Sequence, residues 1–263
     1  MRILVTFAVD AEFAPWRKLR KFNFVDFHGL RLWRTDVANN ELTVLLTGVG
    51  EQAAARAMDL MLRMADNEKH FDVCISSGLA GALHEALTPG DIIAPRMVRV
   101  AFLHAGLQSD SLEVDKHLHH LALGHGAKST DCLFTTDRVL LTAKQKQDCG
   151  CSSKAQSVDM ESFEIVKEAI AWGARSLVVR AVSDAAGEDL PINFNLTLTK
   201  HSQISVTRVV LQLAKNPLAL PALLRFGKQS RLAAAGLAKF MDSYVAGLSD
   251  VRSENAATKV ATR

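Results

Sequence analysis

The stretch Ser176-Leu177-Val178-Val179-Arg180-Ala181-Val182-Ser183-Asp184 decides the fold class of this chain. Its run of aliphatic and β-branched residues predicts a buried strand over 175–183. Asp184 then stands at the carboxyl end of that strand. In an open α/β sheet, ligands bind at the carboxyl ends of the strands, which makes this aspartate a candidate functional residue. Alternatively, Asp184 has a purely structural role, as the N-cap of the segment that follows.

Other acidic residues occupy similar places. Ser157-Val158-Asp159-Met160-Glu161-Ser162 sets two carboxylates at the start of a helix expected over 160–172. Asp10 and Glu12 follow a first buried strand expected over 2–9. Acids at a helix start are also favoured by the helix dipole alone. Brought together, however, such carboxylates can activate water or protonate a leaving group.

Strands and helices alternate along the chain, which predicts an α/β fold with a largely parallel or mixed central sheet. Strands are expected over 2–9, 22–27, 30–35, 41–47, 71–77, 92–102, 127–135, 156–158 and 175–183. Helices are expected over 11–21, 51–65, 112–123, 142–147, 160–172, 196–214 and 218–248. A glycine-punctuated loop is expected over 78–83.

The composition, with 48% hydrophobic and 22% charged residues, is ordinary for a globular enzyme. No apolar run reaches the ~18 residues of a transmembrane helix, and the apolar N-terminus lacks a signal cleavage site. The net charge of +3 points to no particular partner. The 4 cysteines lack zinc-site spacing, so we interpret them as reduced thiols of a cytoplasmic protein without bound metal.

Gly48-x-Gly50-x-x-Ala53 follows one expected strand and opens the next helix. This is the context of a dinucleotide-binding fingerprint, in which backbone amides at a helix start face an anion. A nicotinamide-dependent dehydrogenase is therefore one alternative function. A packing turn explains the spacing equally well.

Several ordered blocks resemble the purine nucleoside phosphorylase / 5′-methylthioadenosine and S-adenosylhomocysteine nucleosidase superfamily. They are 3–12, 46–50, 75–83 with 87–93, 158–161 and 179–184. The resemblance covers 1–185 and implies an α/β domain with a twisted, barrel-like mixed sheet. It also implies cleavage of the N-glycosidic bond of a purine nucleoside without a cofactor.

The resemblance implies a role for each matching residue. Asp184 would be the general acid that protonates N7 of adenine, and Ser183 would orient it. Glu12 would activate the attacking water. Glu161 would accept hydrogen bonds from the ribose 2′- and 3′-hydroxyls, while Met160 would pack under the sugar.

The pocket walls depart from the family pattern in places. Gly78 and Ala80 would lie along the ligand, but Leu79 stands where a serine is common. Val139 occupies the position of an aromatic residue that stacks on the base, so an aliphatic side chain would pack the base. The early arginine-bearing phosphate loop of the phosphorylases is missing, which favours water over phosphate as the nucleophile, with phosphate kept as a possible co-substrate.

The C-terminal part carries a second resemblance, in 189–191 and 216–226, to the hopanoid-associated phosphorylases, which release adenine from adenosylhopane. A basic amphipathic helix can lie on an anionic membrane surface, whereas packing on the domain or a partner subunit is the alternative. We expect an α/β domain over 1–215, an amphipathic helical extension over 216–248 and a disordered tail over 249–263.

The leading hypothesis is a nucleosidase that releases adenine from a 5′-modified adenosine and acts as a homodimer, without nucleic-acid partners. Release of adenine from adenosylhopane is the alternative within the class. A non-catalytic nucleoside-binding protein is the alternative outside it, and the presence of both Glu12 and Asp184 argues against that reading.

Overall fold

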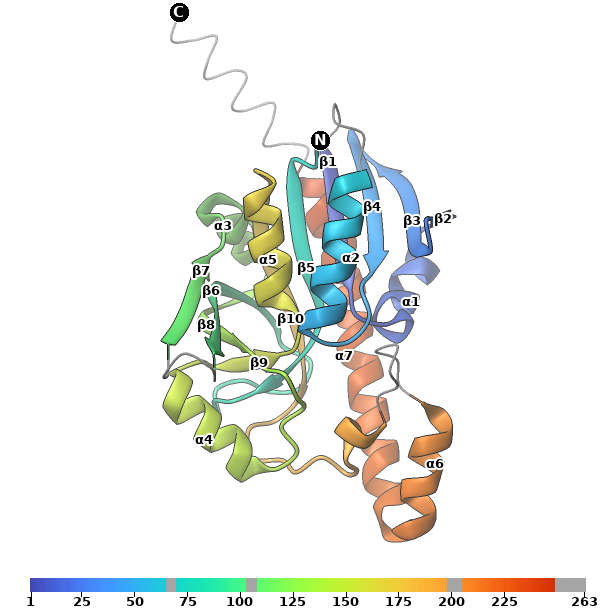
Figure 1. The fold of residues 1–263 in the computed structure, drawn as a ribbon, viewed down its shortest axis with the longest axis vertical. Coiled ribbons are helices and arrows are strands. Elements are labelled where there is room, and N and C mark those ends of the chain that lie inside the picture. Colours follow the sequence, from blue (N-terminus) through green and yellow to red (C-terminus); the bar gives the residue numbers. More distant parts are fainter. Residues whose placement is uncertain (65–69, 103–107, 198–204, 249–263) are drawn as a thin grey trace, which may run out of the picture.

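Ten strands join into one mixed sheet in the computed structural model, which describes residues 1–64, 70–102, 108–197 and 205–248 (Figure 1). The strands are β1 (Arg2–Phe7), β2 (Asn23–Phe27), β3 (Leu30–Val37), β4 (Asn40–Leu46), β5 (Val73–Ala82), β6 (Ile92–Phe102), β7 (Gln108–Glu113), β8 (Lys128–Thr135), β9 (Ser157–Asp159) and β10 (Arg175–Asp184). The helices are α1 (Asp10–Leu19), α2 (Glu51–Met64), α3 (Lys116–Gly124), α4 (Ala143–Ser153), α5 (Ser162–Ala171), α6 (Val206–Lys215) and α7 (Leu220–Gly247), with short 3₁₀ turns η1 (Phe194–Leu196) and η2 (Pro217–Ala219).

The centre of the sheet is a closed ring. Strand β10 pairs in parallel with β5 and in antiparallel orientation with β6. Because β6, β8, β9 and β5 are neighbours in that order, β10 closes the ring by pairing with both of its ends. Strands β1, β4, β3 and β2 continue the sheet outward from β5. The predicted α/β class with a barrel-like mixed sheet flanked by helices is confirmed.

Helices cover both faces of the sheet. Successive side chains of a strand point to opposite faces, and Leu4 and Val5 accordingly belong to different hydrophobic clusters. The Leu4 cluster joins α2 to α5, with Met58 packed in the same cluster as Ile165. The Val5 cluster joins the sheet to α1, α3 and α7.

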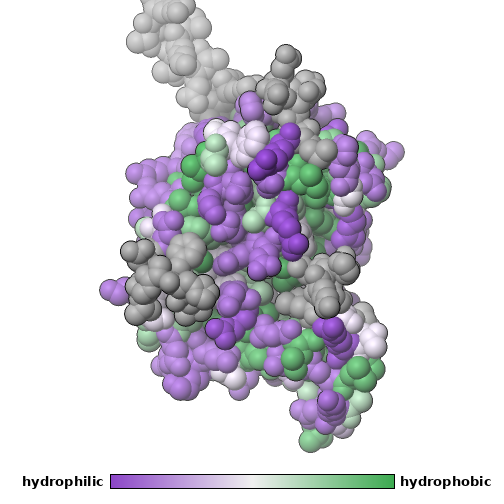
Figure 2. All heavy atoms as spheres, viewed as in Figure 1, coloured by the Kyte–Doolittle hydropathy of each residue, from purple (hydrophilic) through white to green (hydrophobic). Residues whose placement is uncertain are grey.

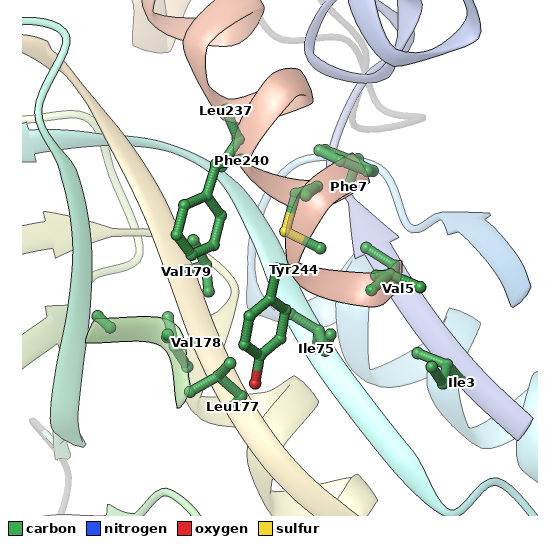
Figure 3. Close-up of a cluster of buried hydrophobic side chains, with 14 of the residues drawn as sticks. Ile3, Val5, Phe7, Ile75, Leu177, Val178, Val179, Leu237, Phe240 and Tyr244 are labelled. Carbon is green, nitrogen blue, oxygen red and sulfur yellow. The ribbon is translucent and has the colours of Figure 1, made fainter. Parts of the chain in front are cut away.

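Helix α7 has two distinct parts. Its later turns lie in the core, where Phe240 and Tyr244 face β1, β5 and β10 (Figure 3), and the Tyr244 hydroxyl donates to the Leu118 carbonyl at 2.9 Å. Its first turns stand out from the rest of the molecule together with α6 (Figure 1). The domain boundary between 215 and 216 stays a prediction, and the predicted tail over 249–263 lies outside the described residues.

Four local expectations were wrong. The helix predicted over 196–214 begins at Val206 in the described residues, where the 3₁₀ turn η1 covers Phe194–Leu196 and 198–204 lie outside the described ranges. The segment 78–83 was predicted as a loop, but β5 runs to Ala82 because it pairs with β10 and β9. The helix predicted from 112 begins only at Lys116, capped by Asp115, whose carboxylate accepts from the Leu118 amide at 2.8 Å. Before it, the polar strand β7 forms by pairing with β6. Helix α4 extends to Ser153, beyond the predicted end at 147.

Candidate active site

A cavity of about 340 Å³ lies at the carboxyl ends of β1, β5, β9 and β10. Strands β1, β5 and β10 are parallel neighbours, so their carboxyl ends reach the same edge of the sheet. The structure gathers there the predicted residues Glu12, Ala80, Val139, Met160, Glu161, Ser183 and Asp184. Gly78 is the one predicted residue that does not line the cavity, although its neighbour Leu79 does.

Glu12 is held by the first turn of α1. Its carboxylate is buried and accepts hydrogen bonds from the backbone amides of Ala8 at 3.0 Å, Val9 at 3.3 Å and Leu79 at 2.9 Å. Burial raises the pKa of Glu12, although Arg180 and these amides act in the opposite direction. A fixed carboxylate with a raised pKa is suited to accept a proton.

Asp10, the neighbouring acid, has a different environment. It forms an ion pair with Arg17 at 2.7 Å and does not line the cavity. The structure therefore places Glu12 at the cavity and Asp10 outside it, in agreement with the role that the family resemblance implies for Glu12.

Glu161 lies beside the glycine turn Gly48–Gly50 that follows β4. The Gly50 amide donates to Glu161 Oε1 at 2.9 Å, and Gly50 has φ +94°, a conformation that favours glycine. The fingerprint-like turn thus binds a carboxylate of the protein itself. Burial and the nearby Asp159 raise the pKa of Glu161 to about 8, against the opposing effect of Arg180.

Arg180 is a buried cation close to Asp159 and Glu161. It is 1% exposed, and its Nη2 lies 2.5 Å from Asp159 Oδ2 and 3.9 Å from Glu161 Oε2. Gly78 has φ +149°, and a Cβ placed there would approach the Arg180 guanidinium and lie 3.0 Å from Glu12 Oε1. Gly78 therefore leaves room for the arginine and the glutamate instead of lining the cavity.

Arg180→Met is expected to lower the free energy of unfolding by about 3–5 kcal/mol, because it leaves Asp159 buried without its counter-charge. Chemical denaturation of the two proteins measures the difference. Arg63→Met is the matched control, since Arg63 pairs with Asp59 at an exposed site and its loss should hardly change the free energy of unfolding. Equal costs for the two variants would contradict the structural role given to Arg180.

Asp184 is held at both carboxyl oxygens. The Ser183 hydroxyl donates to Oδ1 at 2.5 Å, and Lys146 Nζ lies 2.5 Å from Oδ2. Sequence analysis did not identify Lys146, because a lysine in the polar helix α4 gives no local signal of burial. Arg180 did carry a signal, as the charged residue within an apolar strand.

The two candidate catalytic residues, Glu12 and Asp184, lie beside different residues of β5. Glu12 contacts the amide of Leu79, whereas Asp184 is registered with Gly81, two residues further along the strand. Two residues of a strand span roughly 7 Å. A single ligand lying along β5 can therefore meet Glu12 at one part and Asp184 at another.

An apolar wall completes the cavity. Leu190, Phe194 and Phe226 line it, and the two phenyl rings lie 5.2 Å apart between centroids. The Val139 amide donates to the Asn195 side chain at 2.8 Å, which ties the wall to the loop after β8. The aromatic surface missing at Val139 thus has a counterpart in the C-terminal third of the chain.

The thiols and other metal-binding side chains are dispersed. In the described ranges, no group of three or more His, Cys, Asp or Glu side chains is arranged to hold a metal ion. All 4 cysteines are free, and burial raises the pKa of Cys74 to about 12.

Comparison with known proteins identifies a family from the sequence and a shared fold from the structure. The family model of the phosphorylase superfamily matches residues 2–215. The 5′-methylthioadenosine/S-adenosylhomocysteine nucleosidase of Bacillus licheniformis is 26% identical over 237 residues, which are 80% of this chain and 98% of the relative. That of Staphylococcus saprophyticus is 27% identical over 225 residues, 79% and 96% of the two chains.

Solved structures share the fold. The Campylobacter jejuni 5′-methylthioadenosine/S-adenosylhomocysteine nucleosidase has a TM-score of 0.72 at 16% identity, with 94% of this chain and 99% of that chain covered. The native futalosine hydrolase of Helicobacter pylori has a TM-score of 0.68 at 18% identity, with 93% and 97% covered. Since the family model spans 2–215 of the 263 residues, this chain belongs to the phosphorylase superfamily.

Proposed function

We propose that this protein cleaves the N-glycosidic bond of a purine nucleoside, releasing adenine from a 5′-modified adenosine with water as the nucleophile. One observation carries the proposal: two buried carboxyl groups, Glu12 and Asp184, meet one strand at points roughly 7 Å apart in one cavity. The names of the curated relatives support the reaction class.

Asp184 acts at the base. It gives its proton to N7 of adenine while the C1′–N9 bond breaks, so the base leaves as a neutral molecule. Ser183 orients the acid through its hydrogen bond to Oδ1. General acid catalysis of this kind typically contributes 10²–10⁴-fold.

Glu161, Met160 and Glu12 act at the sugar. Glu161 accepts hydrogen bonds from the ribose hydroxyls, and Met160 packs under the ring. The ribose develops positive charge as the base departs, which nearby ionised carboxylates stabilise. Glu12 takes a proton from the water that attacks C1′.

Ala80 and Val139 are the remaining proposed contacts, lying along the ligand and against the base. Gly78 acts indirectly, through the room it leaves for Glu12 and Arg180. We propose no cofactor for this chemistry. The predicted homodimer stays a prediction.

Adenine release tests the proposal. The protein is incubated with adenosine, 5′-methylthioadenosine and S-adenosylhomocysteine, each with and without phosphate, and adenine and free sugar are measured. Release that does not depend on phosphate supports hydrolysis, whereas dependence on phosphate identifies a phosphorylase. Binding of these nucleosides without release would support the non-catalytic alternative.

The projecting helices favour a second candidate substrate, an adenosine with a lipid 5′ substituent such as adenosylhopane. Several large apolar residues there are exposed: Val210, Leu211, Leu218, Leu220, Leu224 and Leu232. Figure 2 shows hydrophobic side chains interspersed with hydrophilic ones on this projecting part, at the lower right. Phe226 and Arg231 of the same part of α7 line the cavity, so a long apolar substituent can pass from the cavity onto these helices.

The charge of the projecting helices fits an anionic lipid surface. From 190 to 241 the sequence contains Lys and Arg but no Asp or Glu. Basic residues beside exposed apolar side chains are the pattern of helices that lie in a membrane interface. In the part of the chain that the structure describes, no helix is long and apolar enough to cross a membrane.

Vesicle binding tests this contact. The protein is expected to sediment with vesicles rich in anionic phospholipid and much less with neutral ones. Leu218→Glu, at a side chain that is 89% exposed, should weaken binding about 10- to 150-fold, because it loses roughly 1.5–3 kcal/mol of apolar burial. Ile170→Glu, an exposed apolar residue of α5, is the control. Equal losses in the two variants would contradict the proposed contact.

A further inference from the structure

Lys146 is a buried charge with a defined set of partners. Its side chain is 1% exposed, and besides Asp184 its Nζ donates to the carbonyls of Ala185 at 2.8 Å and Glu188 at 2.7 Å. An ammonium group has three donors, so each donor has an acceptor. A buried lysine is costly unless it is paired in this way, and this one is fixed against the carboxyl group of the candidate acid.

We infer that Lys146 is a positioning residue for the acid, one that holds the Asp184 carboxyl group and stabilises the negative charge it acquires on giving up its proton. The inference rests on the proposed function. In the structure, Oδ1 accepts from Ser183 and Oδ2 from Lys146. Both oxygens are acceptors, which is the arrangement of the carboxylate left after the proton has gone to the base.

The step balances with Lys146 as a spectator cation. The O–H bond of Asp184 breaks and an N7–H bond forms. The C1′–N9 bond breaks, and its electron pair goes to the base. Glu12 takes one proton from the water that adds to C1′. Exchange with solvent then returns the proton of Glu12 to bulk water and reprotonates Asp184, while Lys146 keeps its three hydrogens throughout.

The location of Lys146 explains why it acts only on the leaving group. It comes from α4 and reaches Asp184 at the base end of the cavity, whereas the sugar end has its own cation, Arg180, beside Asp159 and Glu161. Removing Lys146 should therefore affect departure of the base and leave the attack of water on the sugar unaltered.

Two substrates with different leaving groups distinguish a positioning role of Lys146 from a purely structural one. Lys146→Met is compared with wild type on 5′-methylthioadenosine, whose adenine needs a proton, and on p-nitrophenyl β-D-ribofuranoside, whose phenolate leaves without one. We expect kcat for adenine release to fall about 10²-fold or more, the scale of acid catalysis, with KM changed only a few-fold. Nitrophenol release should change less than about tenfold by the same reasoning.

Loss of folded protein lowers both rates equally, so the ratio of the two rates is independent of stability. Lys144→Met is the matched control on the same helix, because Lys144 pairs with Asp148 at the surface. Equal losses on both substrates, or no loss on either, would overturn the role of Lys146. Failure of the wild type to release adenine would instead refute the proposed function, and this inference with it.

Discussion

Asp184→Asn is expected to lower the rate of adenine release by about 10²–10⁴-fold, the contribution of a positioned general acid. Asparagine has the shape of aspartate but cannot give a proton to N7. The variant retains an oxygen to accept from Ser183 but deprives Lys146 of its counter-charge. Initial rates with 5′-methylthioadenosine measure the loss, and KM should change much less than kcat.

Asp189→Asn is the control for this variant. Asp189 lies close by in sequence but accepts from the Ala143 amide at the surface, so its replacement should leave kcat within a few-fold of wild type. Thermal unfolding shows whether each variant is folded. A folded Asp184→Asn protein with the wild-type rate would remove Asp184 from the mechanism.

Glu12→Gln is expected to cause a loss of similar size, about 10²–10⁴-fold, because an amide cannot take a proton from the attacking water. Asp10→Asn replaces the neighbouring acid, which pairs with Arg17 outside the cavity, and should leave the rate nearly unchanged. If the two variants lost activity equally, the assignment of the base to Glu12 would fail.

The pH dependence of the wild type provides a second check on Glu12. Burial raises the pKa of Glu12, and that of Glu161 to about 8. Both groups act as carboxylates, so kcat/KM should fall as the pH drops through these raised values. The acid limb of the profile therefore lies above the range of an ordinary glutamate, near 4.3. Full activity down to about pH 5 would contradict the environment described for both groups.

Much of the fold was predictable because its signals are local. The apolar strand ending at Asp184 and the first strand before Glu12 show their burial in consecutive residues. Strand β7 was missed because its polar sequence gives no such signal, and the strand exists only through pairing with β6. The continuation of β5 through Gly78 likewise depends on partners that are remote in sequence.

The candidate site divides in the same way. Asp184 was singled out because it stands at the end of an apolar strand, whereas Glu12 was distinguished from Asp10 only by the family resemblance. Lys146 was not identified, because its burial results from the packing of α4 against the loop after β10. Phe226 was not, because the projecting turns of α7 come over the cavity only in the folded chain.

Adenine release by the unmodified protein is the most direct measurement. Incubated with 5′-methylthioadenosine in the absence of phosphate, the wild type should release adenine and free sugar in equal amounts, and Asp184→Asn should release them at least about a hundredfold more slowly. Binding of the nucleoside with no adenine released, from this substrate or from a lipid-linked adenosine, would contradict the assignment of this site as an N-glycosidase.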